Sequence, residues 1–162
     1  MFMFKVKKVL FVCQGNICQS PIAEVVFKDI VSKRGFSEEF EIDSAAIGSY
    51  HVGSEIDSRA QNTLKKHNLY AKKSKKAKQI KDEDFNHYDY IFGMDDENVK
   101  ALKLKAPKGS SAKIIALGAF HPEHDRIIRD PYYEDDDLFE KCYDQCVKCC
   151  SEFLSALKDK DD

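Results

Sequence analysis

The chain has 162 residues, which is long enough to bury a core and short enough to form one domain. Its acidic and basic residues nearly cancel, at a net charge of -2, so neither nucleic acid nor an anionic membrane is expected as a partner. The apolar N-terminal residues are interrupted by lysines, and the next apolar run, 9–13, is too short to cross a bilayer. No signal-peptide cleavage site follows, so we expect a cytoplasmic protein.

The predicted elements alternate between strand and helix. The apolar run at 8–12 predicts a buried strand. After a polar loop, Ser20 is predicted to be the N-cap of a helix that ends at Gly35, because Pro21 suits the first helical position. The rest of the sequence predicts strands at 41–46, 77–80, 88–94 and 113–117, helices at 57–68, 96–106 (capped by Asp95) and 138–157, and a long polar loop at 118–137.

This alternation predicts an α/β fold: a single doubly wound domain over residues 1–162, with about four parallel strands and helices on both faces of the sheet. Residues 1–5 and 158–162 are expected to be disordered. Sheets of this type bind ligands at the carboxyl ends of their strands. The first strand-loop-helix unit is therefore where we expect a site.

Cys13 directly follows the first strand, about seven residues before the helix. Backbone amides of a tight loop that leads into a helix N-terminus bind anions and lower the pKa of a thiol. Gly15 and Asn16 suit the unusual backbone angles of such a loop, and Ser20 can donate its hydroxyl to a thiolate. Cys13 is thus a candidate nucleophile. The alternative is a buried cysteine at the end of a strand, followed by a Ser-Pro helix cap.

A family resemblance rests on several segments in order along nearly the whole chain. The segments, with x at Gln14 and Gln19, are Val9-Leu10-Phe11-Val12-Cys13-x-Gly15-Asn16-Ile17-Cys18-x-Ser20-Pro21-Ile22-Ala23-Glu24, Asp43-Ser44-Ala45-Ala46, Asp89-Tyr90-Ile91 with Met94-Asp95, Asp130-Pro131-Tyr132-Tyr133 and Gln145-Cys146-Val147 with Cys149-Cys150. Together they resemble the low-molecular-weight protein tyrosine phosphatases (acid phosphatases), closest to the eukaryotic branch. The resemblance implies that Cys13 is the nucleophile that becomes a phosphocysteine and that residues 14–20 form the phosphate loop.

The same resemblance implies a general acid and a substrate cleft. Asp130 would protonate the leaving phenol and then activate water, and its place in a polar loop before Pro131 suits this role. Tyr132 and Tyr133 would form the cleft wall, with Tyr50 at a variable aromatic position facing them. Aromatic walls suit a phosphotyrosine ring. The alternatives are an ordinary turn aspartate and surface tyrosines.

Cys18 lies five residues after Cys13, and the resemblance implies that this pair can form a reversible disulfide that protects the nucleophile. A packed thiol is the alternative. The other four cysteines, which lie at helical spacing, are interpreted as packed, reduced thiols rather than a metal site or a disulfide framework. They are Cys142, Cys146, Cys149 and Cys150. Phosphoryl transfer through cysteine requires no cofactor and no metal. The expected ligands are a phosphotyrosine protein or an aryl phosphate, with inorganic phosphate as product or inhibitor.

The sequence departs from the family at Gln19, where the family pattern has an arginine. Arginine provides a charged planar fork that matches two phosphate oxygens, whereas glutamine provides a neutral amide. Because removal of one oxyanion donor costs about 10²–10³ in rate, we expect turnover at least about a hundredfold below an arginine-bearing relative. The alternatives are a catalytically inactive pseudophosphatase that binds phosphorylated ligands or regulates an active relative and, less favoured, an arsenate reductase.

A basic run at 72–78 is expected to be a solvated loop rather than a docking surface for acidic partners. Some relatives have a histidine that braces the loop asparagine. In this chain, lysine-rich sequence near Lys75 lies at that place.

Overall fold

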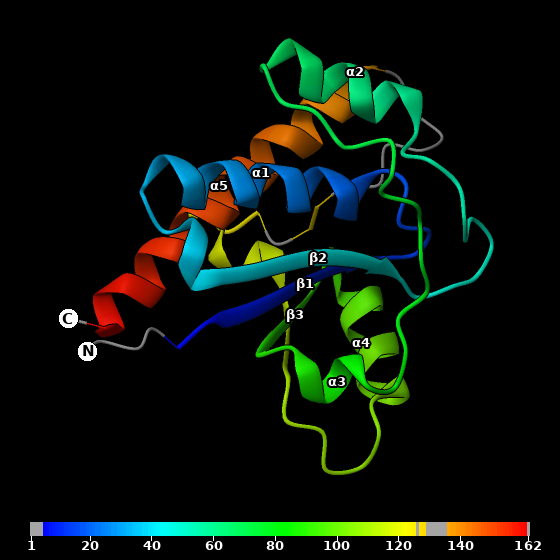
Figure 1. Cartoon of the computed structure of the whole chain (residues 1–162), viewed down its shortest axis with the longest axis vertical. Coiled ribbons are helices and arrows are strands. Elements are labelled where there is room, and N and C mark those ends of the chain that lie inside the picture. Colours follow the sequence, from blue (N-terminus) through cyan, green and yellow to red (C-terminus); the bar gives the residue numbers. More distant parts are fainter. Residues whose placement is uncertain (1–4, 126, 129–135, 162) are drawn as a thin grey trace.

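The structure is a computed structural model that describes residues 5–125, 127–128 and 136–161 (Figure 1). Its sheet has four strands in the order β2-β1-β3-β4, and all three neighbouring pairs are parallel. The strands are β1 (Lys7–Cys13), β2 (Phe40–Ala46), β3 (Tyr90–Gly93) and β4 (Lys113–Ala116). From β1 the chain adds β2 on one side and then β3 and β4 on the other, so the switch point of the sheet lies between β1 and β3. Cys13, the last residue of β1, lies at this switch point, where such sheets bind ligands. The predicted fold class is confirmed.

Helices cover both faces of the sheet (Figure 1). On one face lie α1 (Gln19–Lys33) and α5 (Asp136–Asp161), with α2 (Ser58–Lys66) packed against α5. On the other face lie α3 (Asp84–His87) and α4 (Asp96–Lys105). Two short 3₁₀ helices, η1 (Ser37–Glu39) and η2 (Leu117–Phe120), complete the described elements. The predicted cap of α4 is confirmed, because Asp95 Oδ1 accepts a hydrogen bond from the Asn98 amide at 2.7 Å.

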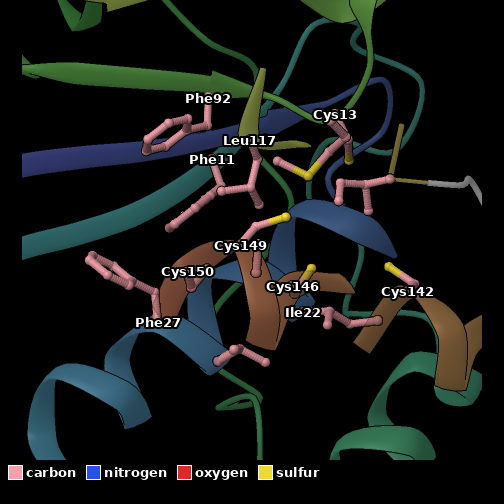
Figure 2. Packing of buried hydrophobic residues seen from close by; sticks show 14 of the residues in the cluster. Phe11, Cys13, Ile22, Phe27, Phe92, Leu117, Cys142, Cys146, Cys149 and Cys150 are labelled. Atoms are coloured by element: carbon pink, nitrogen blue, oxygen red, sulfur yellow. The ribbon is translucent and has the colours of Figure 1, made fainter. Parts of the chain in front are cut away.

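The larger part of the core lies between the sheet, α1 and α5. Phe11 from β1 contacts Phe27 from α1, with ring centroids 5.8 Å apart, and Phe92 from β3 contacts Phe153 from α5 at 4.8 Å. The four cysteines of α5 are free and fully buried in the same cluster as Cys13 (Figure 2). They pack as small apolar side chains, as predicted.

Three local predictions are wrong. The N-cap of α1 is Cys18, not Ser20, because the Ser20 hydroxyl faces Cys13 and not the end of the helix. Residues 77–80 do not form a strand: only one bridge forms, between Gln79 and Ala46 at the end of β2. Residues 158–161 are not disordered but continue α5, because Lys158 pairs with Glu39 at 2.6 Å. Residues 1–4 and 162 lie outside the described part of the chain.

Candidate active site

The site is the loop between β1 and α1, residues 13–20. Cys13 is buried, with 3% of its surface exposed. Its Sγ accepts a hydrogen bond from the Asn16 backbone amide at 3.2 Å and lies 3.0 Å from the Ser20 hydroxyl oxygen. Asn16 has a φ of 59°, in the left-handed region that asparagine tolerates better than most residues. The loop therefore surrounds the sulfur with hydrogen-bond donors, as the sequence predicted.

The electrostatics of Cys13 differ from the expectation. Burial raises the pKa of the Cys13 thiol, and this effect outweighs the lowering by the Ser20 hydroxyl and by the backbone amides of Ser20, Asn16 and Gly15. The donors that lower a thiol pKa are present, as predicted, but the net direction is upward. The physical reason is that the loop removes the sulfur from water, which disfavours the charged thiolate.

A buried chain of hydrogen bonds supports the loop from behind. The Asn16 side-chain amide donates to the Ser20 hydroxyl oxygen and to the Ser44 hydroxyl oxygen, each at 2.9 Å. Ser44 Oγ in turn donates to Glu24 Oε1 at 2.6 Å. Because the Ser20 oxygen already accepts a hydrogen bond from the Asn16 side chain, its own hydroxyl proton is available to Cys13 Sγ. The chain therefore orients Ser20 as a donor to the nucleophile.

Lys75 lies at the outer end of this chain. Its Nζ pairs with Asp43, donates to the Ser44 carbonyl at 3.1 Å and lies 3.6 Å from Glu24 Oε1. Lys78 also pairs with Asp43, and its backbone amide donates to Asn16 Oδ1 at 3.1 Å. Burial opposes ionisation of Asp43, but the two lysines outweigh it and hold the pKa of this carboxyl below its usual value. The lysine-rich segment thus contacts the loop asparagine through the Lys78 backbone amide, a contact that the sequence did not predict.

The basic run at 72–78 is mostly exposed to solvent, as the sequence predicted, but several of its lysines are paired. Besides Lys75 and Lys78, Lys76 pairs with Glu55 at 3.0 Å. Three of its five lysines are therefore held by carboxylates of the same domain. This leaves less free positive charge for an acidic partner.

Gln19 is buried, with 4% of its surface exposed, in the first turn of α1. Its Nε2 donates to the backbone carbonyl of Ile128 at 2.6 Å. Ile128 precedes Asp130 by two residues in the sequence. Position 19 therefore contributes no charge to the loop, and its amide is engaged with the segment that leads to the predicted general acid.

The segment after β2 runs beside the phosphate loop. The amide of Ile47 donates to the Cys13 carbonyl at 2.9 Å, and the amide of Gly48 donates to the Gln14 carbonyl at 3.0 Å. This places Tyr50, which is 82% exposed, on the rim of the site. The prediction that Tyr50 faces Tyr132 and Tyr133 stays a prediction, because those two residues lie outside the described part of the chain.

Two further side chains lie against the glycines of the site. A Cβ atom on Gly48 would approach both Gln14 and Tyr50 to 2.9 Å, and a Cβ atom on Gly15 would approach the His51 ring to 2.9 Å. Both glycines are therefore needed for close packing. His51 is a neighbour of the loop that the sequence did not reveal, because the contact depends on how the segment after β2 folds back.

The other predicted site residues have different outcomes. Ile17 and Cys18 are buried within the loop, and Cys13 and Cys18 are both free thiols. The reversible disulfide between them stays a prediction. The predicted acid Asp130 and the predicted cleft residues Tyr132 and Tyr133 lie outside the described residues.

Within residues 5–125, 127–128 and 136–161, no three metal-ligating side chains lie close enough together to hold a metal ion. Among the helices in those ranges, none is long and apolar enough to cross a membrane.

A parallel α/β sheet whose central strand ends in a cysteine surrounded by amide and hydroxyl donors defines the class of cysteine-centred phosphate-loop proteins. A family model described as "Low molecular weight phosphotyrosine protein phosphatase" matches residues 8–162. The chain belongs to this family, which confirms the resemblance found in the sequence.

Individual relatives agree with this assignment. The chain is similar to Low molecular weight phosphotyrosine protein phosphatase 1 of Drosophila melanogaster, with 50% identity over 92% of this chain and 96% of the relative. It is also similar to the Low molecular weight phosphotyrosine protein phosphatase of Homo sapiens, with 47% identity over 91% of this chain and 94% of the relative. Among solved structures, Primo-1 superposes with a TM-score of 0.88 at 49% identity, covering 93% of this chain and 97% of that one.

Proposed function

We propose that the protein hydrolyses phosphotyrosine in proteins, or other aryl phosphates, through a phosphocysteine on Cys13, with weak turnover. The observation that carries this proposal is the position of Cys13 Sγ, which faces the Asn16 amide at 3.2 Å and the Ser20 hydroxyl at 3.0 Å. Donors in this arrangement favour a thiolate and receive the oxygens of a phosphoryl group.

The proposed reaction has two steps. Cys13 Sγ attacks phosphorus, a P–S bond forms, the P–O bond to the phenol breaks, and Asp130 gives its proton to the leaving oxygen. Asp130, now a carboxylate, then takes a proton from water, which attacks phosphorus. The P–S bond breaks and inorganic phosphate leaves, so the reaction consumes no cofactor. Ser20 stabilises the sulfur both as attacking and as leaving group. The role of Asp130 follows from family membership.

Gln19 limits this chemistry. Charge develops on the phosphoryl oxygens in the transition state, and an arginine at this position would neutralise it. The neutral amide of Gln19 cannot, and its donor is already 2.6 Å from the Ile128 carbonyl. The raised pKa of Cys13 also reduces the fraction of thiolate. We therefore expect turnover at least about a hundredfold below an arginine-bearing relative.

A second candidate function is that of a pseudophosphatase, which binds phosphorylated ligands without turning them over or regulates an active relative. The same two observations favour it. Burial raises the pKa of the Cys13 thiol, and the Gln19 amide donates to the backbone carbonyl of Ile128. The amides of the loop and of the α1 N-terminus would still attract an oxyanion. For both functions we propose a cytoplasmic location and a phosphotyrosine protein as partner.

The test is Gln19→Arg, assayed for steady-state hydrolysis of an aryl phosphate. We expect a gain of at least about a hundredfold, because the guanidinium restores one charged oxyanion donor. Gln14→Arg is the matched control, since it adds the same charge to a loop side chain that lies near Gly48. A Gln19→Arg variant no more active than the wild type would refute the explanation of weak turnover.

Two further measurements separate the enzyme from the binder. A phosphate burst with the wild-type protein, absent in Cys13→Ala, would indicate a covalent intermediate. An NMR titration with vanadate reports whether the loop binds an oxyanion at all. If there is neither turnover nor vanadate binding, both proposed functions are wrong.

A further inference from the structure

Asp125, Ile127 and Ile128 are held from two sides by buried glutamines. From α1, Gln19 donates to the Ile128 carbonyl at 2.6 Å. From α5, Gln145 Nε2 donates to Asp125 Oδ2 at 2.7 Å and to the Ile127 carbonyl at 2.9 Å. Gln19 and Gln145 are 4% and 2% exposed, which is unusual for glutamine. Two buried amides from different helices therefore converge on one short stretch of backbone.

Ile128 is held by hydrogen bonds to both of its backbone polar groups and by burial of its side chain. Its side chain is fully buried, its amide donates to the Met94 carbonyl at 2.9 Å, and its carbonyl accepts from Gln19. Met94 directly follows β3. The amide and the carbonyl of Ile128 are thus held by partners that lie far apart in sequence, Met94 and Gln19.

We infer that Gln19 is a positioning residue that, together with Gln145, fixes the segment leading into Asp130, and that it is not a principal oxyanion ligand. One of the two Gln19 Nε2 hydrogens is engaged with Ile128, and an amide that moved to give both hydrogens to phosphate would leave a buried carbonyl without its partner. A neutral N–H would gain less from phosphate than an arginine does. The balance therefore favours the bond to Ile128.

The inference rests on the proposed function, because it assigns Gln19 to the same reaction, acting through Asp130. It predicts which kinetic parameter depends on Gln19. A loosened segment would move the acid relative to the leaving oxygen, and a misplacement of about 1 Å can cost about 10²-fold in rate. Loss of the Gln19 donor should therefore lower kcat by roughly tenfold or more. The affinity for an oxyanion should change by less than about twofold, because an amide engaged elsewhere contributes little to it.

The experiment compares Gln19→Met, Gln145→Met and the double variant. Methionine preserves the approximate length of glutamine but cannot donate a hydrogen bond. Gln61→Met is the matched control, since Gln61 donates to the Ala71 carbonyl at 2.7 Å on α2, outside the site. Each variant is measured for kcat, for vanadate affinity by NMR and for hydrogen exchange of the Ile128 amide. Protection of the β1 amides shows that each variant is folded.

Both single variants should lower kcat, retain vanadate affinity and speed exchange at Ile128. The double variant should be no slower than the slower single variant, because both changes act on one segment. Gln61→Met should change none of these quantities. If Gln19→Met does not fold, Gln19→Asn, which keeps the amide but shortens its reach, should show the same pattern.

The opposite pattern would overturn the inference. If Gln19→Met weakens vanadate binding severalfold and leaves exchange at Ile128 unchanged, Gln19 is an oxyanion ligand, and the proposed phosphatase function still stands. If the wild type neither binds vanadate nor turns over, the proposed function fails. Exchange at Ile128 in Gln19→Met and Gln145→Met then still decides whether the two glutamines fix this segment.

Discussion

Ser20→Ala would test how the phosphate loop controls its nucleophile. The Ser20 hydroxyl lies 3.0 Å from Cys13 Sγ and accepts from the Asn16 side chain at 2.9 Å, so its proton is directed at the sulfur. A hydrogen bond to a charged group contributes about 1.5–3 kcal/mol. The substitution should therefore raise the pKa of the Cys13 thiol, because the thiolate loses a donor that the thiol does not need. This rise would add to the one that burial already causes.

The assay is the rate of Cys13 alkylation by iodoacetamide as a function of pH, followed by mass spectrometry of the peptide that contains Cys13. At any pH below the thiol pKa, the thiolate fraction of Ser20→Ala should fall by about 10- to 100-fold, which follows from the energy of the lost hydrogen bond. Ser20→Thr, which keeps the hydroxyl, is the control and should stay close to the wild type. An unchanged alkylation midpoint in Ser20→Ala would refute the view that Ser20 donates to the thiolate.

Two predictions concern stability, measured by urea unfolding. Because the lysines hold the pKa of Asp43 below its usual value, this carboxylate stabilises the fold above its unfolded pKa of about 3.9, and the contribution is lost as pH falls through the lower folded value. Asp43→Asn should therefore be less stable than the wild type at neutral pH, with the difference shrinking below about pH 4, whereas an equal deficit at all pH values would contradict this cause. Phe153→Ala should lose about 3–5 kcal/mol, because the ring is 1% exposed and contacts Phe92 at 4.8 Å. A loss below about 1 kcal/mol would mean that the core closes around the deletion.

Elements with a strong local pattern were predictable. The apolar run of β1 indicated a strand buried on both faces, and Asp95 at the start of α4 indicated an N-cap. The short elements α3, η1 and η2 were missed because three or four residues do not establish a period. The end of α5 was missed because its order depends on the contact of Lys158 with Glu39, 119 residues away in sequence.

The residues of the site, like the helices and strands, were predictable from the sequence only in part. The spacing from Cys13 to Ser20 predicted a loop of donors around a thiol, and that geometry is present. The predicted N-cap role of Ser20 was wrong, because its hydroxyl has a tertiary partner in Cys13, which the end of β1 places beside it. His51 was missed because nothing in its sequence neighbourhood indicates that its ring lies against Gly15.

The sequence by itself determined the alternation of the four sheet strands with the longer helices, the loop that carries Cys13, and the absence of a positive charge at position 19. These features depend on residue type and on spacing within a few residues. Only the tertiary structure decided that the Gln19 amide bonds to Ile128 and that burial outweighs the donors in setting the direction of the Cys13 pKa. Both depend on which distant segments exclude water from the loop and which acceptors they place there. Local sequence does not encode those contacts.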